Sequence, residues 1–436
     1  MRDLIITDAA VLLPDGTIRG GQTVEVENGV ISAIRPFREE DRRIPSEEYL
    51  RGTGKLVMPG LADCHMHTGQ QLLKGRVLDA LPMIWTRIML PFESTLDDER
   101  MELSASLAAL EMIHSGTTAF VDAGSYHMEA AAQVYLKSGL RGLLSASTMD
   151  EEGLPVSIAQ NADEAVAQTD RLYDGFHGKG LLKTAYSLRS LISCSDRLVE
   201  KAAQHAADRG ARLQAHMNEY PGEVNYFLVN KKMRPFEYLE SIGVLSERFI
   251  AAHGILLSEN EKEIIARHKV KVCHCPFSNC GKGVPDTPSL NVRGICVGLG
   301  TDGAAHGGLS LWNEMKIFRS VMNALYAGRL NEPAVMPARE IIRMATENGY
   351  RLMGENGGRM ETGRQADLIT IEWNRPHLYP TGSLVNTLLE CVTAGDVCDT
   401  VAGGKVLMKD RQVLTLDEEK IMAEAAAFAE RTGAGL

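Results

Sequence analysis

His65 and His67 are the residues whose type and spacing most directly suggest chemistry. They follow the apolar stretch 55–63, which has the composition of a buried strand. Side chains two residues apart in a strand point to the same side, so both imidazoles would project together from one end of it. Neutral imidazoles are good zinc ligands. Most His-x-His pairs bind nothing, so the meaning of this pair depends on ligands elsewhere in the chain.

Four further polar side chains share one kind of position, because each ends or closely follows an apolar, strand-like stretch. These are His216, Glu219, His253 and Asp302. Each also has a simpler interpretation: a buried histidine can hydrogen-bond a backbone carbonyl, and an aspartate before glycine can cap a helix or form a turn. Their shared position favours a common site.

The elements that must position these side chains recur through the middle of the chain. Short apolar stretches alternate with helical patterns, which predicts parallel βα units. The predicted strands are 56–63, 117–123, 141–148, 181–187, 211–217, 249–254, 270–275 and 295–301. The helical patterns include 100–115, 161–173, 197–209 and 259–268. This succession predicts a (β/α)8 TIM barrel, whose active sites lie at the C-terminal strand ends.

The two ends of the chain have a different pattern. Residues 1–58 contain short strand-like runs separated by glycine turns, and similar runs return after residue 365. An amphipathic helix is predicted over 421–430. We therefore predict an α/β protein with a small β-sandwich domain built from 1–58 and 365–436, the C-terminal helix included, beside a catalytic barrel over 59–364.

Composition narrows the class of protein. The chain has 436 residues, of which 44% are hydrophobic and 24% charged, as is ordinary for a soluble enzyme. Its net charge of −11 argues against a nucleic-acid partner and against attraction to anionic membranes. The sequence shows neither a secretory leader nor an apolar run long enough to span a bilayer. We expect a cytoplasmic protein with a small-molecule substrate.

The eight cysteines lie mostly in apolar runs and are expected to be reduced thiols. Cys273, Cys275 and Cys280 surround His274 and could form a structural zinc site. Strand alternation would place His274 on the face opposite Cys273 and Cys275, so we favour packing for the cysteines and a structural role for the histidine.

Together these stretches resemble the amidohydrolase superfamily, in the branch of nucleobase and nucleoside deaminases and triazine hydrolases. The resemblance is greatest to the 5-methylthioadenosine/S-adenosylhomocysteine deaminase-like group. The similar segments run in family order along nearly the whole chain: 57–67, 72–75, 90–93, 116–122, 216–219, 251–253, 275–279, 300–305 and 366–368.

The resemblance implies one divalent metal ion, with zinc expected and iron as the alternative. Its ligands would be His65, His67, His216 and Asp302. Bridging by a carbamylated lysine is not expected, because the fourth predicted strand offers only Lys183, in its interior. A mononuclear site is therefore predicted.

The resemblance also implies hydrolytic deamination, in which a metal-bound hydroxide attacks an amidine-like carbon and ammonia leaves. Glu219 would carry a proton from the water to a ring nitrogen. His253 would donate a hydrogen bond to the attacking water or the tetrahedral oxygen. Asp302 would orient the hydroxide and pass a proton to the leaving group.

Substrate contacts follow the family pattern less closely. The resemblance places Glu93 against ribose hydroxyls and Arg141 near the substrate. Arg189 stands where the related group has a histidine, an arginine expected near 150–156 is missing, and His306 replaces a small polar residue. These departures argue against a thioether nucleoside, since an arginine suits a carboxylate or a polar ring edge.

The predicted function is a metal-dependent aminohydrolase of an adenosine derivative, a purine or a pterin. A triazine-type chlorohydrolase or cyclic amide hydrolase would use the same site. A non-catalytic scaffold is disfavoured, because Glu219 and all four expected ligands are present. The resemblance further suggests a homo-oligomer.

Overall fold

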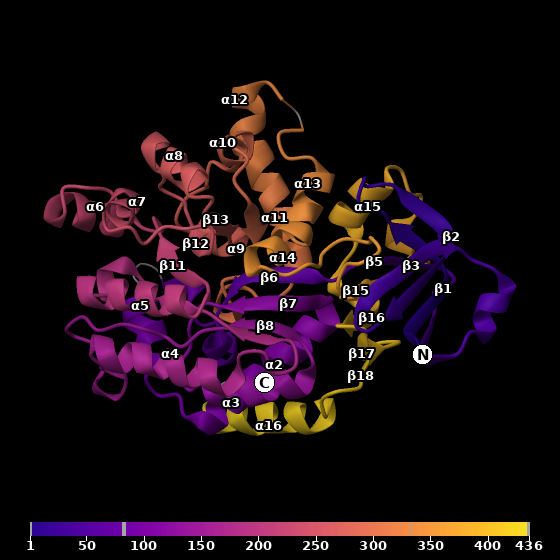
Figure 1. Ribbon diagram of the computed structural model, residues 1–436, viewed down its shortest axis with the longest axis horizontal. Helices are drawn as coiled ribbons and strands as arrows, with labels where there is room; N and C mark the ends of the chain where they lie inside the picture. The colour runs from indigo at the N-terminus through magenta and orange to yellow at the C-terminus, as the bar shows by residue number, and fades with distance from the viewer. Residues whose placement is uncertain (1, 81–83, 333, 434–436) are drawn as a thin grey trace.

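A computed structural model describes residues 2–80, 84–332 and 334–433 of the chain. It contains a barrel of parallel strands surrounded by helices, with a mixed β-sheet packed at one side (Figure 1). The predicted α/β class and TIM barrel are confirmed.

The barrel strands follow the sequence in order. They are β6 (Leu61–Met66), β7 (Thr117–Asp122), β8 (Arg141–Leu144), β9 (Leu182–Thr184), β10 (Tyr186–Leu188), β11 (Leu213–Met217), β12 (Phe249–His253), β13 (Lys271–His274) and β14 (Val297–Leu299). The segments β9 and β10 together form the fourth barrel strand, since Ala185 still bonds to Leu144 whereas Tyr186 bonds to Arg212. The barrel closes where the Thr301 and Asp302 N–H groups donate to the His65 carbonyl.

Helices cover the barrel, and all four helical patterns predicted above are present. The longer ones are α2 (Asp98–Ser115), α3 (Met128–Ser138), α4 (Ala162–Phe176), α5 (Asp196–Asp208), α6 (Pro221–Asn230), α8 (Glu259–Arg267) and α11 (Leu311–Met322). Their starts follow local chemistry: the Asn161 side chain accepts hydrogen bonds from two N–H groups in the first turn of α4, and Ser258 caps α8 in the same manner.

Strands from both chain ends share one mixed sheet. Its members are β1 (Arg2–Leu12), β2 (Ile18–Glu27), β3 (Val30–Pro36), β4 (Ser46–Arg51), β5 (Lys55–Pro59), β15 (Leu368–Glu372), β16 (Val397–Ala402), β17 (Lys405–Lys409) and β18 (Gln412–Val413). The strand order is β18-β17-β16-β15-β5-β1-β2-β3, with β4 beside β1. The antiparallel pair β5–β15 joins the two ends of the chain.

The predicted first barrel strand, 56–63, is wrong in its bounds. It is divided at Gly60 into β5, which belongs to the mixed sheet, and β6, which belongs to the barrel. Gly60 lies so close to β7 that a Cβ atom there would come within 2.0 Å of the Thr118 hydroxyl oxygen. The barrel strand β6 therefore includes His65 and ends at Met66, and His67 is the next residue.

The division into domains over 1–58 with 365–436 and over 59–364 stays a prediction, and residues 1, 81–83, 333 and 434–436 of it lie outside the described part of the chain. Two C-terminal helices nevertheless pack on the barrel. These are α15 (Leu384–Cys391), against α11 and α13 (Ala338–Met344), and α16 (Glu418–Arg431), against α2. Figure 1 shows α16 beneath α2 and α3.

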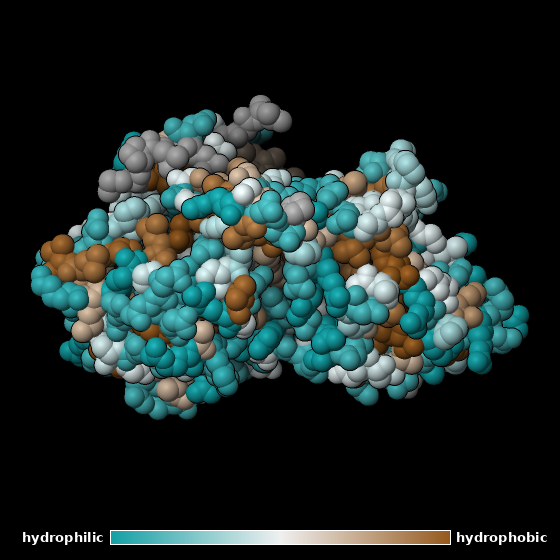
Figure 2. All heavy atoms as spheres, turned by 90° about the horizontal axis from the view of Figure 1, so that it is seen from above, coloured by the Kyte–Doolittle hydropathy of each residue, from teal (hydrophilic) through white to brown (hydrophobic). Residues whose placement is uncertain are grey.

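The face seen in Figure 2 is mostly hydrophilic with several apolar patches, one of them at the end where Figure 1 places α6. Exposed apolar side chains of α6 and the residues after it include Tyr226, Leu228, Val229 and Met233. None of the helices in the described ranges is long and apolar enough to cross a membrane.

Candidate active site

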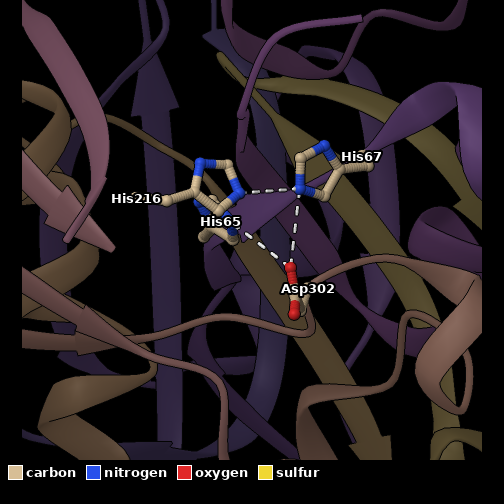
Figure 3. Close-up of side chains that lie close together, drawn as sticks. All are labelled: His65, His67, His216 and Asp302. Carbon is tan, nitrogen blue, oxygen red and sulfur yellow. Dashed lines mark hydrogen bonds and ion pairs between the residues drawn. The ribbon is translucent and has the colours of Figure 1, made fainter. Parts of the chain in front are cut away.

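Three histidines and one aspartate meet at the C-terminal end of the barrel. His65 lies in β6 and His67 just after it, His216 lies in β11, and Asp302 follows β14 (Figure 3). One nitrogen or oxygen atom from each of the four lies within 4.8 Å of all the others. The Nε2 atoms of His67 and His216 are 3.2 Å apart, and Asp302 Oδ1 lies 3.3 Å from His65 Nε2.

The chemistry of this cluster fits a divalent metal. Both ring nitrogens of His65 are buried without a hydrogen-bond partner, an arrangement that is costly unless a ligand satisfies one of them. Burial holds the pKa values of His67 and His216 well below their usual range, so both rings are neutral and keep lone pairs at pH 7. These residues form the predicted metal site.

Three residues at the ends of barrel strands have left-handed backbone geometry. Asn218, His253 and Asp302 have φ angles of 51°, 70° and 60°. Non-glycine residues rarely adopt this left-handed region, and where they do the surrounding structure must hold them there. Asn218 directly follows β11, His253 ends β12 and Asp302 lies three residues after β14, so the chain departs from extended geometry near all three strand ends.

Glu219 and His253 lie beside the metal ligands. With Asp302 they form a second group whose polar atoms lie within 4.8 Å of one another. His253 Nδ1 is 3.0 Å from Asn279 Oδ1, so it carries a proton, and Nε2 lies 3.6 Å from Glu219 Oε1. Burial disfavours ionisation of Glu219, yet His253 and Lys282 outweigh it and lower the pKa of that carboxyl group.

Asp302 is surrounded by donors. Ser278 Oγ donates to Oδ2 at 2.5 Å, and Lys282 Nζ lies 3.4 Å from the same oxygen. Burial opposes the charge of Asp302, but attraction from His306 and Lys282 holds its pKa well below the usual range. The carboxylate is therefore ionised at neutral pH, as a metal ligand must be.

Glu93 and Arg189 meet on the other side of the metal cluster. Arg189 Nη2 donates to Glu93 Oε1 at 2.9 Å, and Gln70 donates to the same oxygen at 2.8 Å. Glu93 Oε2 is buried without a partner and remains free to accept a hydrogen bond.

Arg189 also lies 3.1 Å from His67 Nδ1. Arginine only donates, so this contact needs a lone pair on Nδ1. When Nε2 of a neutral imidazole binds a metal, Nδ1 carries the proton. The Arg189–His67 contact and metal binding by neutral His67 therefore exclude one another.

Arg141 does not reach this site, and its predicted substrate contact is corrected. It is the first residue of β8, at the opposite end of the barrel, where Nε donates to Asp367 Oδ2 at 2.6 Å. Lys183 is also remote, paired with Glu355 at 2.5 Å. Where the chain is described, no cysteine belongs to a group of ligand atoms close enough to hold a metal. His274 is structural, donating from Nδ1 to the His253 carbonyl at 2.7 Å.

Two residues at the site were missed by the sequence analysis. Lys282 places Nζ 2.5 Å from Glu219 Oε1 and 2.8 Å from Ser278 Oγ. Glu223 lines the same cavity, and burial raises its pKa to about 8, so that it is protonated at neutral pH. Both lie in segments that follow barrel strands, but farther from the strand end than Glu219, Lys282 after α9 (Pro276–Cys280) and Glu223 within α6.

The cavity in front of the metal ligands is small, about 80 Å³. Its lining includes Trp85, Met89 and Tyr220 as well as Arg189 and Lys282. Pockets that hold drug-sized ligands have volumes of about 300–1,000 Å³. A nucleoside would therefore have to displace some of these side chains.

Comparison with known proteins agrees with this geometry. The sequence model of the amidohydrolase family matches residues 56–407. The chain is 33% identical over 433 residues to the 5-methylthioadenosine/S-adenosylhomocysteine deaminase of Pelotomaculum thermopropionicum, with 98% of each chain covered. It is 32% identical over 440 residues to the 5'-deoxyadenosine deaminase of Methanosarcina acetivorans, with 99% of this chain and 98% of the relative covered.

Solved structures share the fold. An adenosine deaminase from Xanthomonas campestris with bound zinc matches with a TM-score of 0.90 and 27% identity, over 98% of both chains. An atrazine chlorohydrolase from Arthrobacter aurescens in complex with zinc matches with a TM-score of 0.88 and 22% identity, over 97% of this chain and 99% of the other. The second similarity is one of fold alone.

Proposed function

Because this chain belongs to the amidohydrolase family, we propose that it removes the amino group of an adenosine derivative by hydrolysis and releases ammonia. The observation that carries the proposal is the metal cluster with Glu219 and His253 directly beside it. A divalent ion held there would lower the pKa of water to about 7 and so supply the nucleophile at neutral pH. Zinc is the expected ion, and iron can use the same ligands.

The surrounding side chains supply the proton transfers. Glu219 is ionised and within reach of Asp302, so it can take a proton from the attacking water and deliver it to a ring nitrogen. His253 faces the same space through Nε2 and, when protonated, donates to the developing oxyanion. Asp302, whose Oδ2 lies near Lys282, would accept the proton of the hydroxyl group on the tetrahedral carbon and pass it to the leaving amine.

The substrate class rests on Glu93 and on the relatives. Glu93 Oε2 is a buried acceptor with no partner, which a ribose hydroxyl would satisfy. Two relatives named above as deaminases act on adenosines altered at the 5′ position, according to their names. We therefore propose a 5′-modified adenosine. Arg189 is already paired with Glu93, so it orients that carboxylate and leaves Oε2 available.

A substrate panel tests this proposal. Ammonia release would be measured with adenosine, 5′-deoxyadenosine, 5′-methylthioadenosine, guanine, a pterin and a chlorotriazine. We expect the adenosines to have the highest kcat/KM. Chloride release without ammonia would instead support a triazine-type chlorohydrolase. Opening of a cyclic amide ring would support a cyclic amide hydrolase.

Glu219→Gln tests the mechanism. We expect it to keep the metal and the fold and to lose about 10²–10⁴ of kcat, because it removes the proton carrier. Glu200→Gln, a change in α5, provides the control. Metal content near zero in wild-type protein after zinc or iron supplementation would favour a scaffold, whereas full activity of Glu219→Gln would remove Glu219 from the mechanism.

The setting of the enzyme is proposed on general grounds. All eight cysteines are free thiols, as is usual in the cytoplasm. The net charge of −11 does not suit nucleic acid. The exposed apolar residues of α6 suit self-association, which light scattering at several protein concentrations would measure.

A further inference from the structure

A second cavity lies at the end of the barrel opposite the metal site. It has a volume of about 510 Å³ and opens where β11, β12, β13 and β14 begin. Arg212 and Arg248 directly precede β11 and β12, and Lys271 is the first residue of β13. The cationic side chains that line the cavity are Arg212, Arg248, Lys269, Lys271, Arg293 and Arg351.

The charge of this cavity is not balanced by the protein. Glu247 is the one carboxylate among its lining residues. Arg293 is already paired with Glu259 and Glu263, both at 2.8 Å. Within the described ranges, no carboxylate lies at ion-pair distance from any of the other five cations. Such clustering is unexpected in a chain whose net charge is −11.

The two more buried of these cations, Arg212 and Lys271, have no carboxylate acceptor. Arg212 Nη1 is buried without a partner, and Lys271 Nζ reaches only the carbonyls of Glu247 and Lys269, at 3.1 and 2.7 Å. Burial and the nearby Arg248 lower the pKa of Arg212. Burial lowers that of Lys271, with Arg212 and Arg351 adding to the effect. The folded protein thus holds like charges together at a cost.

We infer that this cavity binds a small polyanion carrying at least two adjacent phosphate groups. Arginine binds phosphate oxygens in pairs, and five unpaired cations exceed what one monovalent anion neutralises. The volume lies within the range of small-molecule sites, about 300–1,000 Å³. The inference goes beyond the proposed deamination and does not depend on it.

Binding there would connect the segments that lead into the metal site. Arg212 precedes the strand that carries His216, and Arg248 precedes the strand that ends in His253. A ligand that binds only the folded state raises its stability by an amount that grows with the logarithm of the ligand concentration above Kd. The bound polyanion would therefore tie four adjacent strands together beneath the catalytic residues.

Calorimetry and thermal unfolding of the metal-loaded protein with inorganic pyrophosphate test the inference. The cavity variant is Arg248→Ser/Arg351→Ser. Both arginines are exposed in the wild type, so the variant should fold. The matched control, Arg19→Ser/Arg375→Ser, removes two exposed arginines elsewhere. We expect saturable binding and a raised Tm in wild type and control, and an affinity weakened by roughly tenfold or more in the cavity variant.

Further measurements distinguish a nucleotide ligand from phosphates alone, and binding in the cavity from removal of the metal ion. Cytidine 5′-diphosphate that binds tighter than pyrophosphate would assign the site to a nucleotide, and equal affinities would assign it to the phosphates alone. If pyrophosphate acted by removing the metal ion, it would change the Tm of wild type, cavity variant and control by the same amount. Equal affinity in cavity variant and control, no binding to wild type, or the same Tm rise with chloride at equal ionic strength would overturn the inference.

Discussion

Lys282 lowers the pKa values of both carboxylates proposed for proton transfer, together with His253 at Glu219 and His306 at Asp302. Its Nζ atom lies 2.5 Å from Glu219 and 3.4 Å from Asp302, and the side chain is almost fully buried. It also lies over the Tyr220 ring, at 5.4 Å from the centroid. The proton-transfer roles proposed for Glu219 and Asp302 therefore depend on a residue in a loop of irregular structure.

Replacement of Lys282 by methionine should shift the pH profile. Attraction to Lys282 lowers the pKa values of Glu219 and Asp302, so its loss raises both. The proposed mechanism needs both carboxylates ionised, so the acid limb of the kcat/KM profile should move to higher pH. Relative to wild type, kcat/KM should fall more at pH 6 than at pH 8. Lys282→Arg keeps the cation and should stay near the wild-type profile. An unmoved acid limb in Lys282→Met would refute this electrostatic role.

His216→Ala should lower metal content. The substitution removes one of the four residues that would hold the metal. Loss of a residue that only hydrogen-bonds a metal ligand lowers metal affinity by about 10–100-fold, so loss of the ligand itself should lower metal affinity by more. Metal analysis after dialysis against a weak chelator measures the change. His205→Ala, in α5, is the matched control. Equal metal content in the two variants would show that His216 is not a ligand.

The strand-to-helix order of the barrel explains why much of the site was predictable. Parallel strands end at one rim, so an apolar run followed by a polar residue identified His216, Glu219, His253 and Asp302 before any coordinates. The expected substrate contact of Arg141 came instead from the family resemblance, and it is wrong because Arg141 begins a strand and so lies at the other end of the barrel. Lys282 was missed because loops have no periodicity to read.

The sequence pattern did not show the division between β5 and β6, and the reason is a different one. Residues 56–62 are free of polar side chains, since one half is buried in the mixed sheet and the other in the barrel. No change of pattern marks Gly60, where the chain passes from one sheet to the other. The structural requirement at that point is a close approach to Thr118, which only a glycine allows.

Gly60→Ala should destabilise the protein by about 1–3 kcal/mol, because the new methyl group would collide with the Thr118 side chain and push β6 away from β7. Gly20→Ala, in β2, is the control, because nothing lies within 4 Å of the added atom. Its effect should stay within about 0.5 kcal/mol. Urea unfolding measures both. Similar unfolding midpoints would mean that β6 accommodates the methyl group.

The two domains are joined by a buried ion pair. Arg141 in β8 donates to Asp367, which also accepts from the Tyr350 hydroxyl at 2.9 Å and the Gly403 N–H at 2.6 Å. Asp367 directly precedes β15 of the mixed sheet. Barrel and sheet are thereby connected through one carboxylate that is 1% exposed.

Arg141→Leu should therefore destabilise the whole molecule by about 3–5 kcal/mol, since it leaves Asp367 buried and without its cation. Thermal unfolding should show a clearly lower Tm. Arg171→Leu is the matched change at an exposed arginine, 4.0 Å from Glu129, and should cost about 0–1 kcal/mol. If both variants unfold at the same temperature, the ion pair does not hold the domains together.

The pairing of β5 with β15 has a consequence for the order of synthesis. Lys55 in β5 bonds to Asp399, which lies 344 residues later in the chain. At about 5–20 residues per second, a ribosome needs roughly 20–70 s to make the intervening segment. During that time the edge of β5 that later receives β15 has no partner. Lys55 and Pro59, at the two ends of β5, are residue types that discourage an unpaired edge from pairing with another chain.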